Sequence, residues 1–513
     1  MKKLLANFFF ILFISVILVL SIRGIEGNPT SNTVNLEKWK DEGPFELSPE
    51  RGRFALTLSI IENKSVEFST SIAQFATPDL GLKNGKFVSL FAPLLSFLII
   101  PGYWLGSIWG FAQVGVYATI SIFALLNIIL IRKISLKLGS HPVAANIAAA
   151  LFLFGTPAFA YAVSLYQHHV STFLLLLSVL LLHGSRSWLK LFLVWFLCSL
   201  SIPLDYPNLF MMLPIISVAI WQTVIFTKSQ DKIHVGIRPV IFFAISGVVA
   251  PLVFFFWFNA ASYGNPFTLI SSLSQVKALT PQGKLIENTE KSDEVSTTRT
   301  RENRSTVGFF NSRLFLRGLG VLVVSPDRGF IFFAPIVLLG ILGGIVLYRR
   351  RTSELPILLA VIGFNISLYS MWGDPWGGWA FGGRYLIPTF AIVSIFLSIA
   401  LTRFRNNIFF MIIFLLVATY SIAVNTLGAI TSNRNPPQVE TVELEKLSGK
   451  HEPYTWERNI NFLNANKSKS FFYNTFAYRW MNAWTYYQYI TISIVVIIGL
   501  MLAFLSSKPL KHN

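Results

Sequence analysis

A carboxylate and two arginines open a short polar stretch of the sequence, Glu50-Arg51-Gly-Arg53. Ser48 and Pro49 stand before it and predict the start of a helix, because proline fits the first helical position. The apolar residues that follow are too few to cross a bilayer, which takes about 20 helical residues. We therefore expect a helix on the membrane surface with Glu50 at its N-terminal end, where a carboxylate could act as a base. The alternative is a charged loop that an interfacial helix anchors.

Two further arginines, Arg328 and Arg384, are predicted at the outer ends of membrane helices, each next to glycine. The planar guanidinium group matches phosphate oxygens, and a neighbouring glycine lets a ligand approach the backbone closely. The alternative for each is an interfacial anchor whose charge reaches the headgroup region. Asp327 could simply form an ion pair with Arg328 at a helix N-terminus. As a pair, the two arginines would suit the phosphate of a membrane lipid.

A glycine-rich turn runs from Trp372 to Tyr385 and contains three tryptophans and five glycines before Arg384. Interfacial tryptophans form the aromatic belt of many membrane proteins. Trp376 and Trp379 could instead offer a flat ring on which a sugar packs. The number of glycines exceeds what an aromatic belt requires, which favours a loop that binds a ligand.

His168 and His169 are adjacent at a predicted helix junction. The side chains of neighbouring helical residues diverge by about 100°, so these two do not easily share one metal ion. A hydrogen-bond donor or an acid/base group is the better interpretation of one of them.

The composition is that of an integral membrane protein. The chain has 513 residues, of which 53% are hydrophobic and only 13% are charged. Its formal charge of +18 lies largely in short loops between apolar runs, where it sets membrane topology, so it does not indicate nucleic-acid binding. The single cysteine, Cys198, excludes an intramolecular disulfide.

The apolar runs predict an all-α polytopic fold of about twelve transmembrane helices, with interfacial helices in a large first outer loop. The helices are expected at about 5–22, 111–131, 142–163, 170–183, 188–204, 208–226, 239–258, 330–347, 355–371, 386–402, 407–425 and 488–506. The stretch 87–106 contains two prolines and is expected to be interfacial or re-entrant. Basic residues gather in the loops that this count turns inward, which places both termini in the cytoplasm. The segments 24–88, 259–328 and 426–487 then face outward.

The unusual polar residues gather on the predicted outer side. They are Glu50, Asp79, Gln167, His168, His169, Asp205, Tyr206, Asp327, Arg328 and the stretch from Asp374 to Arg384. A channel or pump would place ionisable groups at mid-membrane depth, and the apolar runs contain almost none. The sequence therefore predicts an outward-facing site and no path through the membrane.

With these stretches in place, the chain resembles the GT-C superfamily of polyprenyl-phosphate-sugar-dependent glycosyltransferases. Within it, the chain is similar to the prokaryotic group related to protein mannosyltransferases and lipopolysaccharide-core sugar transferases. The resemblance covers most of the chain and is carried by residues 48–57, 79–93, 325–335 and 376–385, of which the last two stretches are the more specific.

The resemblance implies a catalytic carboxylate in the first outer loop, acting as a base or as a metal-assisted activator of the acceptor. That role falls on Glu50. The family often has an acidic pair at this point, where this sequence has Glu50-Arg51, so the intact pair Asp41-Glu42 stays as the rival. Asp79 would be the second loop carboxylate.

The resemblance also implies that Arg328 and Arg384 hold the donor phosphate and that the outer loop 259–328 is a lid over the substrates. The other side chains expected at the substrate are Arg53, His168, His169, Asp205, Tyr206, Asp327, Trp376, Trp379 and Tyr385. Residues 1–426 would form a GT-C-like catalytic module that includes the acidic loop 24–88, and 427–513 an outer segment with the last helix.

The sequence therefore predicts a multi-pass plasma-membrane glycosyltransferase that moves a sugar from a polyprenyl-phosphate donor to a glycan, lipid or protein acceptor on the outer face. The sequence specifies no cofactor and leaves open whether a divalent cation is needed. No nucleic acid is expected as a partner. The alternatives are a lipid-linked glycan flippase or transporter, and a glycan ligase or polymerase.

Overall fold

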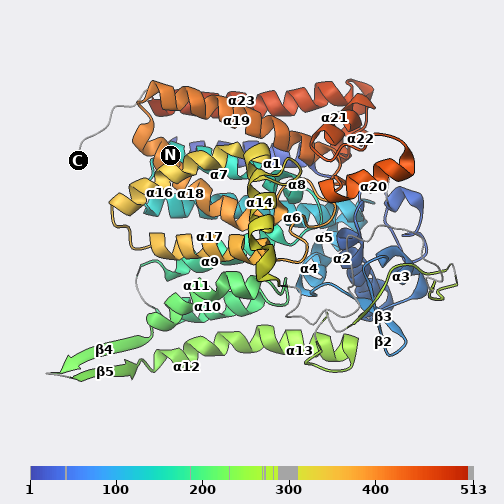
Figure 1. Ribbon diagram of the computed structural model, residues 1–513, viewed down its shortest axis with the longest axis horizontal. Helices are drawn as coiled ribbons and strands as arrows, with labels where there is room; N and C mark the ends of the chain where they lie inside the picture. The colour runs from blue at the N-terminus through green and yellow to red at the C-terminus, as the bar shows by residue number, and fades with distance from the viewer. Residues whose placement is uncertain are drawn as a thin grey trace.

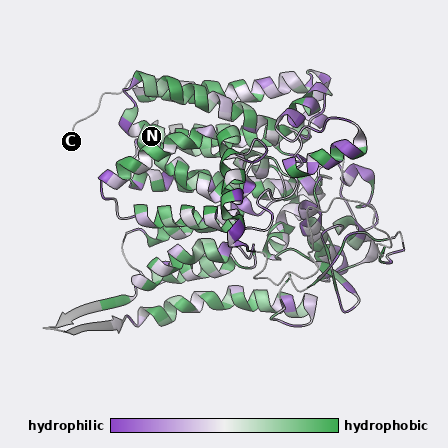
Figure 2. Ribbon diagram, viewed as in Figure 1, coloured by the Kyte–Doolittle hydropathy of each residue, from purple (hydrophilic) through white to green (hydrophobic). Residues whose placement is uncertain are grey.

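The computed structural model describes residues 2–40, 43–184, 187–229, 232–268, 270, 273–280, 282–286 and 310–506. Long helices lie side by side in a common direction and form a bundle (Figure 1). Their surfaces are largely apolar, whereas polar residues gather at one end of the bundle (Figure 2). This distribution is the one expected of helices whose outer surface faces lipid.

The bundle contains an apolar helix at each of the twelve predicted positions. These helices are α1 (Lys2–Ser21), α6 (Ala112–Lys137), α7 (Pro142–Phe154), α9 (His168–Leu182), α10 (Trp188–Leu200), α11 (Asn208–Trp221), α12 with α13 (Val240–Ile245 and Val249–Tyr263), α16 (Gly340–Arg349), α17 (Leu355–Ser370), α18 (Ile387–Phe404), α19 (Ile408–Ile430) and α23 (Ala483–Ser506). Five helical stretches in the described part are long and apolar enough to cross a membrane: Ala112–Lys137, Ile241–Tyr263, Arg384–Phe404, Ile408–Ile430 and Ala483–Ser506. The full count of twelve spans stays a prediction.

The two ends of the bundle differ. We call the end where α1 begins and α23 finishes the terminal end; it also carries the hairpin of β4 (Val224–Ser229) and β5 (Lys232–Ile237) (Figure 1). We call the opposite end the loop end. It carries α2 (Ser48–Leu58), α3 (Thr70–Ala76) and the late helices α20 (Gln438–Ser448), α21 (Glu457–Asn464) and α22 (Phe471–Thr475).

A small antiparallel sheet at the loop end departs from the all-α prediction. Its strands are β1 (Glu67–Phe68), β2 (Leu80–Lys83), β3 (Lys86–Ser89) and β6 (Ser274–Val276), in the order β1-β3-β2-β6. Asn84 and Gly85 both have positive φ and form the two-residue turn between β2 and β3, for which Asn-Gly is the favoured pair. Because β6 pairs with β2, the second outer segment is tied to the first.

The stretch 87–106 does not form one span. It contains α4 (Leu94–Leu98) and α5 (Ile100–Ile108), which meet at Ile99, and its interfacial or re-entrant course stays a prediction. α5 exposes Trp104, Leu105 and Ile108, which suits contact with lipid.

The position of α2 differs from the prediction of a helix on the membrane surface. Gly52 and every residue from Arg53 to Leu58 are buried. Phe54 packs on Phe45 with a ring-centroid distance of 4.4 Å, and a Cβ at Gly52 would lie 2.4 Å from the Phe91 ring. The residues of α2 from Gly52 onward are therefore covered by other segments of the loop end, and they do not face lipid.

Cysteine labelling tests which side each end faces. Cys198 is only 2% exposed, so the background should be low. We expect Lys86→Cys, at the loop end, to react with a membrane-impermeant maleimide in intact cells. Ser353→Cys, at the terminal end between α16 and α17, should react only after permeabilisation. Labelling of Ser353→Cys in intact cells with protection of Lys86→Cys would invert the predicted topology.

Candidate active site

Glu50 is the third residue of α2 and is fully buried. Its Oε1 accepts a hydrogen bond of 3.2 Å from the backbone N–H of Leu165, while Oε2 has no hydrogen-bond partner in the described part of the chain. Burial raises the pKa of Glu50 to about 7, and the negative charge of Glu46 adds to this shift, although Arg23 opposes it. A carboxylate with such a pKa is a stronger base than an exposed one.

The residue after Leu165 begins an aromatic pair. Tyr166 lies between α8 (Ala158–Ala162) and α9, and its ring stacks on that of His168 at 6.0 Å and 9°. Both residues are buried. The hydroxyl of Tyr166 and Nε2 of His168 have no hydrogen-bond partner among the residues that the structure describes.

Arg384 approaches the same pair from the glycine-rich turn. It begins a 3₁₀ turn, η9 (Arg384–Leu386), that leads into α18, and its guanidinium lies 4.9 Å from the Tyr166 ring centroid. Its Nη2 donates to the carbonyl of Gly377 at 2.6 Å, but Nε and Nη1 have no described partner. Tyr385 lies beside it and contacts the ring of His168 edge-on at 6.2 Å.

A second guanidinium contacts the same tyrosine. Arg53 lies 5.7 Å from the ring centroid of Tyr166 and donates from Nη2 to Oε1 of Gln167 at 2.6 Å. Gln167 in turn donates to Oδ2 of Asp205 at 2.8 Å. Tyr166 therefore contacts two cations through its ring, which attracts cations through its π electrons.

Glu50, Tyr166, His168 and Arg384 make up what we call the unpaired cluster, because each is buried with at least one polar atom that lacks a described partner. Buried polar groups are nearly always hydrogen-bonded, and leaving one unsatisfied costs about 1–3 kcal/mol. Several such atoms on Glu50 and on the contacting side chains of Tyr166, His168 and Arg384 are therefore suited to binding a polar ligand. The cluster holds both an unpaired carboxylate oxygen and unpaired guanidinium nitrogens.

The two arginines with similar sequence surroundings have different surroundings in the structure. Arg328 donates from Nε to the carbonyl of Trp376 at 2.8 Å and from Nη1 to that of Asp327 at 2.7 Å. Its Nη2 donates to the carbonyls of Gly378 and Asn435. Arg328 thus joins three backbone segments, and as it lies here its donors are used by carbonyls and not by a phosphate.

Neighbouring predicted residues also serve the backbone. Asp327 accepts hydrogen bonds from the hydroxyl of Ser325 and, at 2.9 Å, from the backbone N–H of Gln438, the first residue of α20. A carboxylate at a helix N-terminus is stabilised by the helix dipole. The glycine-rich turn and the C-terminal segment are therefore held together by Asp327 and Arg328.

Arginine side chains lie against two of the three tryptophans of the turn, Trp376 and Trp379. Trp379 donates from Nε1 to Oε2 of Glu440 at 2.7 Å, and the guanidiniums of Arg434 and Arg458 lie 5.7 and 5.5 Å from its ring centroid. Trp376 has Arg317 at 5.1 Å from its ring. Their predicted contact with a sugar stays a proposal, and in this arrangement cations lie against both rings.

Other predicted residues lie apart from the unpaired cluster. His169 contacts the carbonyl of Ala158 through Nε2 at 2.8 Å, Tyr206 packs edge-on against Phe255, and Asp79 accepts from Ser48 at 2.6 Å and from Gln275 at 3.1 Å. Asp41 and Glu42 lie outside the described residues. In the part of the chain that the structure describes, no three His, Cys, Asp or Glu side chains form a group able to hold a metal ion.

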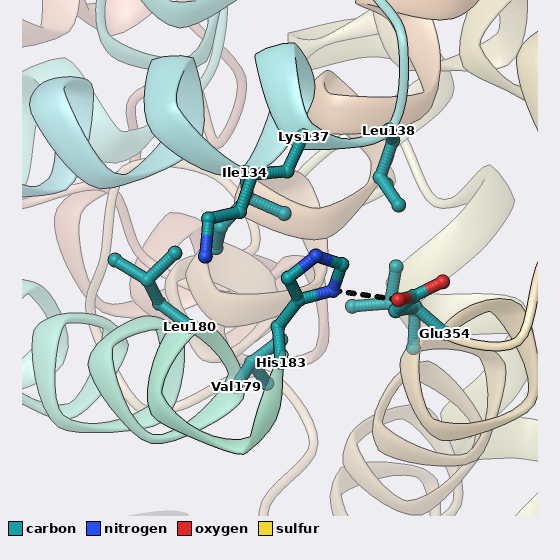
Figure 3. A pocket seen from close by; sticks show the side chains of 8 residues that line it. Ile134, Lys137, Leu138, Val179, Leu180, His183 and Glu354 are labelled. Atoms are coloured by element: carbon teal, nitrogen blue, oxygen red, sulfur yellow. Dashed lines mark ion pairs between the residues drawn. The ribbon is translucent and has the colours of Figure 1, made fainter. Parts of the chain in front are cut away.

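A pocket at the terminal end is distinct from this cluster (Figure 3). It is lined by Ile134 and Lys137 of α6, by Val179 and Leu180 of α9, and by Leu138, His183, Glu354 and Leu358, and its volume of about 10 Å³ suits a single water molecule. His183 Nδ1 and Glu354 Oε1 form an ion pair of 2.6 Å across it. Since α9 rises by about 20 Å between His168 and His183, this pocket is not part of the same site.

No protein-family model and no curated protein matches the chain. Among solved structures, the chain is similar to ArnT from Cupriavidus metallidurans in the apo state, with 13% identity and a TM-score of 0.48, and to the same protein bound to undecaprenyl phosphate, with 12% and 0.47. Each match covers 98% of this chain and 76% of ArnT. A match to the Archaeoglobus fulgidus oligosaccharyltransferase has 11% identity and a TM-score of 0.37, and covers 98% of this chain and 57% of that one.

The roles of individual residues in this chain are inferred from the geometry of its own unpaired cluster.

The contacts of Arg328 predict a structural role. Arg328→Met should lower the free energy of unfolding by about 2–4 kcal/mol, because it leaves buried carbonyls without donors. Thermal unfolding of the detergent-purified protein measures this. Arg317→Met, in which an exposed arginine is removed from the Trp376 ring, serves as the control and should change stability little. An Arg328→Met protein as stable as the wild type would contradict the structural role.

Proposed function

We propose that this protein is a membrane glycosyltransferase that moves a sugar from a polyprenyl monophosphate to an acceptor hydroxyl on the outer face of the membrane. The proposal rests on the unpaired cluster, in which a buried carboxylate with an unpaired oxygen, Glu50, and a buried arginine with unpaired donors, Arg384, both lie within electrostatic reach of Tyr166. The resemblance of the sequence to GT-C enzymes is consistent with this proposal. ArnT, to which the chain is similar, has been solved with bound undecaprenyl phosphate.

Glu50 would accept the proton of the acceptor hydroxyl at Oε2 while the acceptor oxygen attacks the anomeric carbon. The bond between that carbon and the phosphate oxygen breaks, and the lipid phosphate leaves with the electron pair. The N–H of Leu165 holds the other oxygen of Glu50, which fixes the direction of the free one. General bases placed in this way contribute about 10²–10⁴-fold to a rate.

Arg384 would bind the leaving phosphate through Nε and Nη1, since its Nη2 is already held by the Gly377 carbonyl. Positive donors aimed at a developing negative charge supply a large part of catalysis in buried sites. His168 and Tyr166 would add hydrogen bonds to the same phosphate or to the sugar. Arg53 would contribute charge while its own donors hold Pro49 and Gln167.

The raised pKa of Glu50 predicts the pH dependence of transfer. A base must be ionised, so the rate should fall as the pH drops through about 7, where Glu50 becomes protonated. Glu50→Gln should lower the transfer rate by about 10²–10⁴-fold at every pH, because the amide cannot accept the proton. The measurement is transfer by proteoliposomes supplied with a panel of radiolabelled polyprenyl-phosphate sugars.

Glu457→Gln is the matched control, because Glu457 is exposed at the start of α21. Full activity in Glu50→Gln would remove Glu50 from the reaction. No transfer by the wild type from any donor in the panel would contradict the proposed function itself.

A further inference from the structure

A second buried carboxylate, Glu46, lies in the segment that leads into α2. It is 2% exposed, and groups from distant parts of the chain lie against its oxygens, of which Oε1 has an ion-pair contact but no hydrogen bond among the described residues. Oε2 lies 3.3 Å from Nη1 of Arg23 and accepts from the backbone N–H of Asn433 at 2.8 Å, and Oε1 lies 3.2 Å from Nζ of Lys469. Burial alone would raise the pKa of Glu46, but Lys469, Arg23 and the Asn433 N–H together lower it, so Glu46 is ionised.

The two cations are buried as well. Arg23 is completely buried after α1 and donates to the carbonyls of Gly428 and Ala429 at the end of α19. Lys469 is 8% exposed and donates to the carbonyl of Gly43 at 3.0 Å. An uncompensated buried cation is costly, so each must have an anionic partner close by.

Among the described carboxylates, Glu50 also lies within electrostatic reach of Arg23. The charge of Arg23 lowers the pKa of Glu50, and that of Glu46 raises it. The remaining titratable groups that act on Glu50 or feel its charge are Arg53 of α2, Tyr117 of α6 and Tyr166.

A hydrogen-bonded path also joins the two carboxylates. Asn433, whose N–H is held by Glu46, donates from Nδ2 to the hydroxyl of Ser164 at 3.4 Å. The next residue, Leu165, donates its N–H to Glu50. Glu46 therefore acts both on the charge near Glu50 and on the loop that orients it.

We propose that Glu46 is a positioning residue that holds Arg23 and Lys469 on its own carboxylate and so leaves Oε2 of Glu50 unpaired. Without Glu46, the two buried cations would lack their carboxylate partner and would act on Glu50, which would make it a weaker base. The part of this inference that concerns an acceptor at Oε2 rests on the proposed function, whereas the pairing of charges does not.

The test measures the protonation of Glu50 directly, in the purified full-length protein in lipid nanodiscs. A hydrophobic carbodiimide reacts with protonated carboxyl groups, so mass spectrometry of the Glu50 peptide against pH gives a labelling midpoint. The wild-type midpoint should lie near pH 7. In Glu46→Gln it should fall by at least about one pH unit, because a like charge is lost and two cations gain influence on Glu50.

Lys469→Met should move the midpoint in the opposite direction, because it removes a positive charge and leaves Glu46 less compensated. Glu457→Gln should leave the midpoint unchanged. An unchanged or raised midpoint in Glu46→Gln would overturn the inference. If that variant fails to fold, as judged by gel filtration and circular dichroism, Lys469→Met decides, and an unchanged or lowered midpoint there would overturn it.

The same proteins separate this inference from the proposed function. If the midpoints shift as expected while the wild type transfers no sugar, Glu46 has its role and the proposed reaction is wrong. If the wild type transfers sugar, the acid side of the rate profile should move to lower pH in Glu46→Gln, together with the labelling midpoint.

Discussion

The structure depends on keeping one carboxylate, that of Glu50, buried and half unpaired among cations. Burial removes water, which raises the pKa of the group and strengthens every charge near it. The same burial would draw a neighbouring cation onto the free oxygen. The loop end is built so that this does not happen: Leu165 holds one oxygen of Glu50, Glu46 holds Arg23 and Lys469, and Gln167 and Pro49 hold Arg53.

The C-terminal segment is part of this arrangement. Asn433 and Lys469 bind Glu46, the carbonyl of Asn435 accepts from Arg328, and the N-terminus of α20 is capped by Asp327. Residues after 426 therefore contact the loops around Glu50, and the division into a catalytic module at 1–426 and an outer segment at 427–513 stays a prediction. These contacts join the segment after residue 426 to Glu46, Asp327 and Arg328 at the loop end.

The sequence predicted the bundle well because apolar runs of sufficient length have few alternatives in lipid. An apolar helix overlaps each of the twelve predicted ranges. Of the two prolines of 87–106, Pro93 stands just before α4 and Pro101 lies in the first turn of α5. The sequence also brought Arg53, His168 and Arg384 forward as candidates, and all three contact Tyr166. Two further candidates are one contact away, since Tyr385 packs against His168 and Asp205 accepts from Gln167. The sequence Asn84-Gly85 is typical of a two-residue β-hairpin turn, and the all-α prediction did not include the hairpin that it forms.

Other features could not be predicted from the sequence because they depend on partners far along the chain. Arg328 and Arg384 both stand beside glycines, yet the first is used by backbone carbonyls and the second has free donors. Glu46 has no distinguishing neighbour in sequence, and its Asn433 partner is 387 positions away. The burial of α2 likewise follows from packing at Gly52 and Phe54 and not from the short apolar pattern itself.

The most direct test of the unpaired cluster as a phosphate and acceptor site is a cryo-electron microscopy structure of the protein with bound polyprenyl phosphate in nanodiscs. The phosphate should lie against Nε and Nη1 of Arg384, within reach of His168 or Tyr166, on the side that Oε2 of Glu50 faces. Arg328 should keep its four carbonyl contacts. A phosphate bound at Arg328, or at the terminal end of the bundle, with Arg384 still unpaired, would contradict the account.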